Sequence, residues 1–424
     1  MTRPPADAAA HTADLAAFVT ASPSSFHAAH EIARRLQQHG FELLDETQAW
    51  PTGPGRRVVV RDGAAIAWVV PDGAGPTTPV TVLGTHTDSP GFKLKPRPTS
   101  TRAGWLQAGV EVYGGPLLNS WLDRDLALAG RVVTRDGAQH LVRTGPLLRI
   151  PQLAIHLDRQ VNDGLTLDKQ RHTQPVWGLA GDGHADVLAA AVDGVCEADD
   201  VVGFDLVVAD TQEPRVLGAD DELFASGRLD NLLSTHAALE ALLGFEGGDR
   251  VAVLAAFDHE EVGSESRSGA AGPFLEDVLA RVRSGLGADD EQSRRALAAS
   301  WCVSSDVGHS VHPNYVERHD PANLPVAGGG PILKINANQR YTTDAPGAAL
   351  WRGACERVGV PSQDFVSNNA VPCGSTIGPI TATRLGIRTV DVGAPILSMH
   401  SARELCAVVD PWFLARAMGS VLAG

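Results

Sequence analysis

Residues 251–261 read Val-Ala-Val-Leu-Ala-Ala-Phe-Asp-His-Glu-Glu, and this stretch decides the fold. A run of seven apolar residues is typical of a β-strand in a parallel sheet that is covered on both faces. The acidic and imidazole side chains that follow would stand at the carboxyl end of that strand, where open α/β sheets bind ligands. The stretch therefore predicts an α/β domain with a functional site at one edge of its sheet.

Similar side chains occur at the ends of other predicted elements. They are His86 and Asp88 after strand 79–84, Asp230 at the start of helix 229–244, Asp306 after strand 301–304, and His400 after strand 387–392. Each has an ordinary explanation on its own, such as a helix cap or a hydrogen-bonded loop histidine. Together they predict one joint site.

These side chains are of the types that bind a pair of divalent metal ions. Two His, two Asp and one Glu could hold two ions, and imidazole and carboxylate sites accept Zn²⁺, Mn²⁺ or Co²⁺. Of the adjacent Glu260 and Glu261, one can bind a metal while the other activates a water molecule. His309 and His312 are rival ligands. The pattern indicates a co-catalytic metallohydrolase.

Composition excludes several other classes of protein. The chain has 424 residues and a formal net charge of −15, which repels phosphate backbones and anionic lipid. We expect neither a nucleic-acid partner nor a membrane, since no apolar run approaches about 18 residues and no signal peptide is evident. Five scattered cysteines without a C-x-x-C motif favour a reducing compartment, and we expect a cytoplasmic protein.

The pattern of apolar and turn residues changes along the chain and predicts two domains. Residues 95–218 consist of short alternating runs broken by Gly and Asp-Gly turns, which indicates a β-rich insertion. Residues 1–94 and 219–424 would form a discontinuous α/β domain. Helices are expected at residues 12–20, 24–39, 184–192, 229–244, 272–283, 290–300 and 410–422, and strands at 57–60, 65–70, 79–84, 201–209, 251–257, 301–304, 331–337 and 387–392.

Eight short segments carry a family resemblance that runs from about residue 13 to the C-terminus. They are His86-Thr-Asp-Ser-Pro90, Arg149-Ile-Pro-Gln-Leu-Ala-Ile-His-Leu157, Arg228-Leu-Asp-Asn231, Glu260-Glu-Val-Gly-Ser264, His312-Pro-Asn314, Gln339-Arg-Tyr341, Gly374-Ser-Thr-Ile-Gly378 and Ser398-Met-His-Ser-Ala-Arg-Glu404. In these segments the chain resembles the aspartyl aminopeptidase family of dinuclear metallopeptidases. The resemblance implies a mixed, mostly parallel sheet flanked by helices, of the zinc-peptidase type.

The resemblance also implies a role for each site residue. Asp230 would bridge two metal ions, most often Zn²⁺. The remaining ligands would be His86 and Asp306 at one ion, and Glu261 and His400 at the other. Glu260 would be the general base, and Asp88 the partner of His86.

The β-rich insertion would be the dimerisation domain of a homo-oligomer, a dodecamer built from dimers as in the family. His156 would reach the active site of a neighbouring subunit and touch substrate or metal. Lys334 and Tyr341 match positions that line the substrate pocket. Lys334 could pair with an acidic substrate side chain, although it could equally be an ordinary surface lysine.

We therefore predict a metal-dependent aminopeptidase that removes N-terminal residues, preferably Asp or Glu, from peptides. Two alternatives remain open. One is a related dinuclear hydrolase such as a carboxypeptidase or deacylase. A carboxypeptidase would need an arginine for the C-terminus of its substrate, and Arg340 and Arg403 are candidates. A metal-stabilised scaffold without activity would not need Glu260, because a structural site requires ligands but no base.

Overall fold

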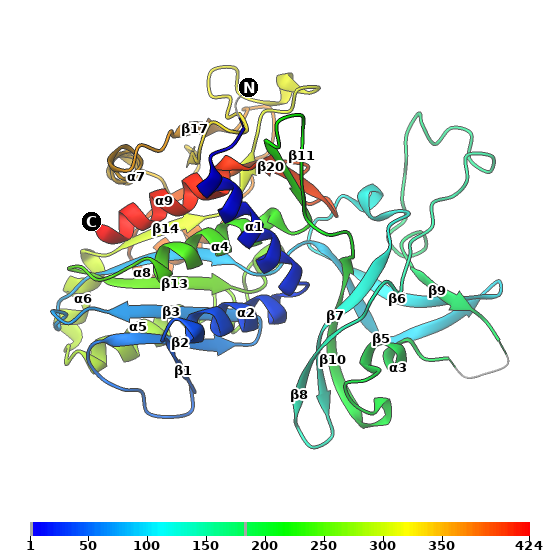
Figure 1. Ribbon diagram of the computed structural model, residues 1–424, viewed down its shortest axis with the longest axis horizontal. Coiled ribbons are helices and arrows are strands. Elements are labelled where there is room, and N and C mark those ends of the chain that lie inside the picture. Colours follow the sequence, from blue (N-terminus) through cyan, green and yellow to red (C-terminus); the bar gives the residue numbers. More distant parts are fainter. Residues whose placement is uncertain (1–2, 182–184) are drawn as a thin grey trace.

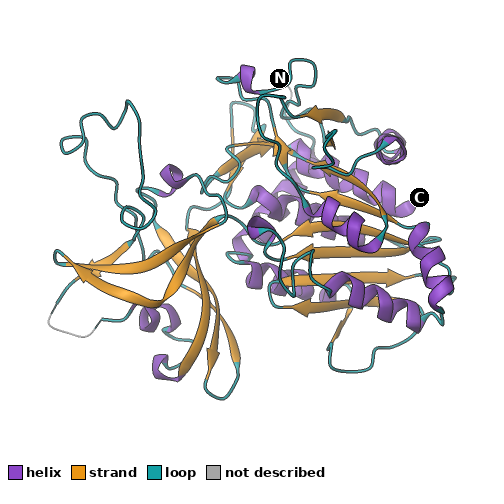
Figure 2. Ribbon diagram, turned by 180° about the vertical axis from the view of Figure 1, so that it is seen from behind, coloured by secondary structure: helices purple, strands orange, loops and turns teal. Residues whose placement is uncertain are grey.

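The computed structural model describes residues 3–181 and 185–424, which form two lobes. The larger lobe is an α/β layer structure, and the smaller lobe is a twisted β-sheet that stands beside it (Figure 1). The view from behind shows helices on both faces of the sheet in the larger lobe (Figure 2). No helix in these two ranges combines the length and apolar character needed to cross a bilayer.

The larger lobe is built on a nine-stranded mixed sheet. Its strands, in spatial order, are β1 (Glu42–Leu44), β2 (Gly55–Arg61), β3 (Ala64–Val70), β13 (Val251–Phe257), β4 (Val80–His86), β14 (Trp301–Ser305), β18 (Arg388–Gly393), β16 (Ile332–Ile335) and β17 (Gln363–Val366). Five of the eight neighbouring pairs are parallel. Strands β13, β4 and β14 run parallel to one another at the centre, so their carboxyl ends meet at one edge.

Strand β13 joins the two cores of this lobe. Ala252, Leu254 and Ala256 face one core, and Val253 and Phe257 face the other, because successive side chains of a strand point to opposite faces. All seven residues of β13 are buried, as the uninterrupted apolar run predicts.

Helices cover both faces of the sheet. On one face lie α1 (Ala6–Ala21), α2 (Ser25–Gln38), α4 (Leu229–Leu243), α7 (Ala345–Arg357) and α9 (Val409–Ala423). On the other lie α5 (Phe274–Gly285), α6 (Asp290–Ala298) and α8 (Ile377–Leu385). Helices α4 and α9 pack side by side and are almost entirely buried along their apolar positions.

The smaller lobe has an antiparallel sheet and a core of its own. In spatial order its strands are β8 (Gln139–Arg143), β7 (Leu126–Thr134), β10 (Val201–Asp210), β5 (Gly91–Arg102), β6 (Trp105–Tyr113) and β9 (Val176–Leu179), with the short helix α3 (Val187–Val192) packed against them. A third sheet joins β11 (Arg215–Leu217), β12 (Leu223–Ser226), β20 (Glu404–Ala407), β19 (Pro395–Leu397) and β15 (Gly308–His309).

The predicted fold class is confirmed as a mixed α/β structure with a β-rich insertion. The antiparallel sheet begins at Gly91 and ends at Asp210, and the division into two domains stays a prediction. Helix α1 is longer than the predicted helix 12–20, since it begins at Ala6. Sequence analysis gave no prediction for α7 and α8, whose first turns contain Pro346 and Pro379.

Candidate metal centre

The predicted site residues meet at the carboxyl edge of the nine-stranded sheet. His86 ends β4, Glu260 and Glu261 follow β13, and Asp306 follows β14, and these three strands are neighbours. His400 enters from the turn between β19 and β20. The sheet order therefore brings together side chains that are more than 300 residues apart in the sequence.

Asp230 lies between the two imidazoles. Its Oδ1 is 3.3 Å from Nε2 of His86, and its Oδ2 is 3.4 Å from Nε2 of His400. On the first side, Oδ1 of Asp306 lies 3.7 Å from His86 Nε2. On the second side, Oε2 of Glu261 lies 3.6 Å from His400 Nε2. Each oxygen of Asp230 thus faces a different group of ligand atoms.

These distances fit metal ligands better than hydrogen bonds. Nitrogen and oxygen atoms in hydrogen bonds lie closer, at about 2.7–3.2 Å. Two ligand atoms of a tetrahedral zinc ion with bonds of about 2.0–2.1 Å lie about 3.3 Å apart. Oδ1 of Asp230 and Oε1 of Glu261 are buried and have no hydrogen-bond partner among the described residues. Buried oxygens of this kind need a partner, and a divalent cation would supply one.

The electrostatics of the site also favour a bound cation. Burial, with the nearby carboxylate of Asp230, raises the pKa of Glu261 well above its ordinary value. Burial lowers the pKa of His86, but the carboxylates of Asp230 and Asp306 outweigh this and raise it well above 6.5. Both directions reflect an excess of buried negative charge. The residues present therefore fit a divalent metal.

The backbone around the site is strained. Arg228, His259 and His400 have φ angles of 58°, 63° and 66°, in the left-handed region that residues other than glycine rarely adopt. Helix α4 is irregular at Asp230, whose side chain does not cap the helix. The guanidinium of Arg228 donates to the carbonyls of Val19 and Ser22, where α1 ends. At this irregular start of α4, the carboxylate of Asp230 faces the imidazoles and does not cap the helix.

Asp88 holds the main chain of the Glu260–Glu261 pair. Its Oδ1 accepts the N–H of Glu260 at 3.0 Å, and its Oδ2 accepts the N–H of Glu261 at 3.1 Å. Nδ1 of His86 lies 3.1 Å from the carbonyl oxygen of Asp88 and 3.4 Å from its carboxylate. Asp88 therefore orients His86 mainly through its main chain.

Glu404 likewise holds the main chain of two site residues, and this role was not predicted from the sequence. Its Oε2 accepts the N–H of Asp230 and its Oε1 accepts the N–H of His400, both at 2.9 Å. It is 2% exposed. The only sequence signal was its place in the segment Ser398–Glu404, where an acidic residue opens an apolar run.

A cavity of about 500 Å³ opens next to these residues. Glu260, Lys334 and Tyr341 line it, as does His309. Lys334 is buried, and its Nζ donates to the carbonyl of Val307 at 2.8 Å and lies 3.9 Å from Oδ2 of Asp306. The same Nζ lies 5.4 Å from the centre of the Tyr341 ring. Lys334 is therefore a cation in the wall of the cavity and not a surface lysine.

The other candidate residues lie outside this cavity. His312 lines an adjoining cavity, where its Nδ1 accepts the N–H of Asn314. His156 is exposed in the long loop between β8 and β9, which projects from the smaller lobe (Figure 1). Arg403 donates to carbonyls of residues 212 and 213, and Arg340 is exposed.

Comparison with known families decides the class of enzyme. The family of aminopeptidase I zinc metalloproteases (M18) matches residues 18–417. The chain belongs to the M18 family. The predicted family relationship and the prediction of a hydrolase are thus confirmed, and the scaffold and carboxypeptidase alternatives are not supported.

Relatives of the M18 family match nearly the whole chain. A probable M18 family aminopeptidase 2 of Streptomyces avermitilis is 56% identical over 422 residues, which is 98% of each chain. One from Mycobacterium leprae is 45% identical and covers 95% of this chain and 96% of its own. Among solved structures, a cryo-EM structure of an Ape4 and Nbr1 complex has a TM-score of 0.93 at 36% identity, with 99% of this chain and 87% of that chain covered.

A dodecamer of mApe1 from S. cerevisiae has a TM-score of 0.84 at 27% identity, with 96% and 95% covered. An M18 aminopeptidase of Thermotoga maritima, at 24% identity, shares the fold with a TM-score of 0.89. The M18 fold therefore extends over both lobes of this chain.

Proposed function

We propose that this M18 aminopeptidase uses two divalent metal ions that share Asp230. His86 and Asp306 would complete one ion's ligands, and Glu261 and His400 the other's. The observation that carries the proposal is the position of Asp230, whose two oxygens lie 3.3 Å and 3.4 Å from two different imidazoles. Zinc fits this set of nitrogen and oxygen ligands, and Mn²⁺ or Co²⁺ would also fit.

Glu260 would act as the general base. A bound metal pair would supply Lewis acidity toward the scissile carbonyl and the attacking water. Glu260 lines the cavity, and its Oε2 lies 3.9 Å from Nε2 of His86. Burial and the carboxylates of Asp306 and Asp230 raise the pKa of Glu260 to about 7. Its carboxylate would take a proton from the attacking water and pass it to the leaving amine. Asp88 would hold Glu260 in place through its N–H.

Lys334 and Tyr341 would favour acidic N-terminal residues. An Asp or Glu side chain that enters the cavity would meet a buried ammonium whose nearest carboxylate, Asp306, lies at 3.9 Å. A neutral side chain would leave this cation without a further partner. The missing interaction would lower kcat/KM for neutral substrates relative to acidic ones. The ring of Tyr341 forms the neighbouring wall and would limit the size of the side chain.

The protein would work as a homo-oligomer, a dodecamer built from dimers through the smaller lobe. Leu153, Ile155 and Leu157 in the loop that carries His156 are 56%, 50% and 75% exposed, and such a loop would gain from burial in a neighbouring subunit. His156 would then reach the neighbour's cavity and contact substrate or metal. All five cysteines are free thiols, which supports a cytoplasmic location.

Peptide hydrolysis tests the proposal. The metal-loaded protein should release the first residue from a peptide with a free N-terminal amine, and the N-acetylated form of the same peptide should not react. A panel of first residues would then rank Asp and Glu against Ala and Leu. Equal cleavage of the acetylated peptide would exclude an aminopeptidase mechanism.

A further inference from the structure

One segment of the smaller lobe reaches the metal centre at two points, Asp88 and His400. Residues 113–120 leave the end of β6 and run past the carboxyl edge of the nine-stranded sheet. Tyr113 contacts Asp88, and Gly115 contacts His400. The two lobes are therefore joined at the metal centre itself, in addition to their covalent connections.

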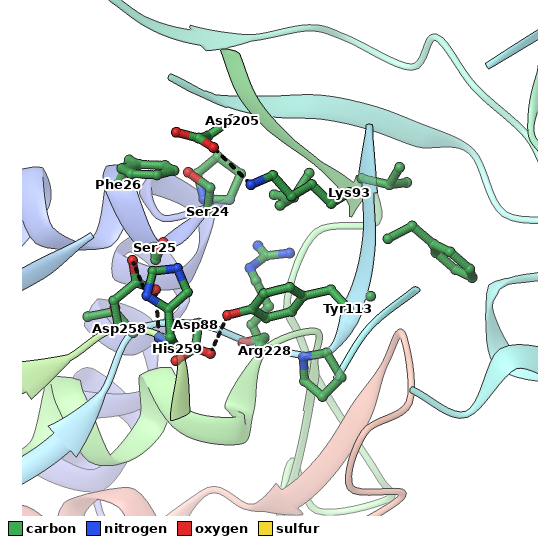
Figure 3. Close-up of a pocket in the computed structure, with 18 of the residues that line it drawn as sticks. Ser24, Ser25, Phe26, Asp88, Lys93, Tyr113, Asp205, Arg228, Asp258 and His259 are labelled. Atoms are coloured by element: carbon green, nitrogen blue, oxygen red, sulfur yellow. Dashed lines mark hydrogen bonds and ion pairs between the residues drawn. The ribbon is translucent and has the colours of Figure 1, made fainter. Parts of the chain in front are cut away.

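The first contact is a hydrogen bond from Tyr113 to Asp88. The hydroxyl of Tyr113 lies 2.8 Å from Oδ2 of Asp88, the same oxygen that accepts the N–H of Glu261. Figure 3 shows Tyr113 pointing at Asp88 from the side of a cavity. This cavity of about 210 Å³ is lined by both lobes, for example by Ser25 and Lys93.

The second contact fixes the tautomer of His400. Nδ1 of His400 lies 3.0 Å from the carbonyl oxygen of Gly115, so this nitrogen carries the proton and donates it. Nε2 is then left with a lone pair, and it faces Asp230 and Glu261. The N–H of Leu117 also donates to the carbonyl of His400 at 2.9 Å. The segment thus sets the orientation of this imidazole.

Gly114 shows how closely the segment approaches the centre. Its φ is 66°, and a Cβ atom at this position would lie 3.1 Å from Cβ of Glu261 and 3.2 Å from its carbonyl oxygen. A larger residue would be strained and would press on Glu261. At the far end of the segment, the hydroxyl of Ser120 accepts the N–H of Ala402, beside His400.

We propose that this segment positions Glu261 and His400, the two ligands that complete one of the proposed ions, so that the smaller lobe sets the affinity of the larger lobe for that ion. Tyr113 is a positioning residue that acts through Asp88 on the Glu260–Glu261 pair. Gly115 acts on His400. Contacts of this kind to metal ligands are worth about 10–100-fold in metal affinity or activity. The inference rests on the proposed two-metal function.

A Tyr113→Phe variant tests this inference, with Tyr315→Phe as the control. Both changes remove one hydroxyl, but Tyr315 is 55% exposed and lines the adjoining cavity that holds His312, whereas the hydroxyl of Tyr113 is bonded to Asp88. Metal affinity of the full chain would be measured by competition with a chelator, and metal content by elemental analysis. We expect Tyr113→Phe to bind zinc about 10-fold more weakly or worse. Excess zinc should restore its activity, and the thermal midpoint of the metal-free protein should fall only by the small amount that one lost hydrogen bond costs.

Two results would distinguish failure of the positioning role from failure of the proposed two-metal function. If the wild type binds two zinc ions and Tyr113→Phe binds them as tightly as Tyr315→Phe does, the positioning role is wrong and the proposed function stands. If the wild type binds no zinc, the proposed function itself fails. Should Tyr113→Phe fail to fold, Ser120→Ala tests the other end of the segment, where weaker zinc binding is expected and unchanged binding would overturn the inference.

Discussion

The carboxylate of Glu404 accepts the main-chain N–H of Asp230 through Oε2 at 2.9 Å, and through Oε1 it holds a second N–H, that of His400, at the same distance. One buried side chain therefore fixes the main chain under the proposed bridging ligand and under a ligand of the second ion. A carboxylate suits this position because both of its oxygens accept and neither donates.

We predict that Glu404→Gln weakens metal binding. The amide nitrogen of glutamine would face one of the two N–H groups, which would then lose its acceptor. Metal affinity and activity should fall by about 10–100-fold, as is typical when an outer contact of a metal ligand is lost. Chelator competition measures this, with the exposed Glu356→Gln as control. Equal affinity in the two variants would show that Glu404 does not support the site.

Glu260→Gln should lose turnover and keep its metals. Glutamine cannot accept a proton, and the loss of a general base costs about 10²–10⁴ in rate. Glu260 is given no metal in the proposed arrangement, so elemental analysis should find the wild-type content. A variant depleted of metal would instead make Glu260 a ligand and move the base elsewhere.

Lys334→Met should change the order of preferred substrates. The loss of a charge-assisted contact of about 1.5–3 kcal/mol corresponds to roughly 10–100-fold in kcat/KM for Asp and Glu substrates. Ala and Leu substrates should be unaffected or cleaved faster. The exposed Lys169→Met is the control, and metal content must be checked because Asp306 lies 3.9 Å from Lys334. A uniform loss on all substrates would mean that Lys334 supports Asp306 and does not recognise the substrate.

His156→Ala should lower activity in the assembled protein without removing metal. If His156 donates to the charge that develops on a neighbour's substrate, its loss can cost about 10²–10³-fold in kcat. His39→Ala is a control on the exposed end of the α2 region. Subunits separated by dilution should also be inactive although folded. Full activity per chain after dilution would show that each active site is complete within one subunit.

The sequence predicted the strands and site residues that are marked by a pattern within a few neighbouring residues. The apolar run of β13 and the motif that follows it placed Glu260 and Glu261 at the sheet edge, where the structure has them. His86 and Asp306 follow from the same rule. Helices α7 and α8 were not predicted, although Pro346 and Pro379 lie in their first turns, where proline is compatible with a helix.

Contacts between distant segments could not be predicted in the same way. Tyr113 and Asp88 are 25 residues apart and belong to different lobes, and Glu404 and Asp230 are 174 residues apart. No local pattern encodes either pair, since each depends on how the sheets are placed against one another. The sequence also left open whether Asp230 caps a helix, and only the irregular start of α4 turns its carboxylate toward the imidazoles.

The most direct test of the two-metal account is removal and return of the metal, followed by anomalous scattering from crystals of the zinc-loaded protein. Chelation should abolish activity, and zinc should restore it. Two anomalous peaks per chain are predicted, one between Asp230 and His86 and one between Asp230 and His400. A single peak in a fully active enzyme, or full activity after confirmed loss of all metal, would contradict the account.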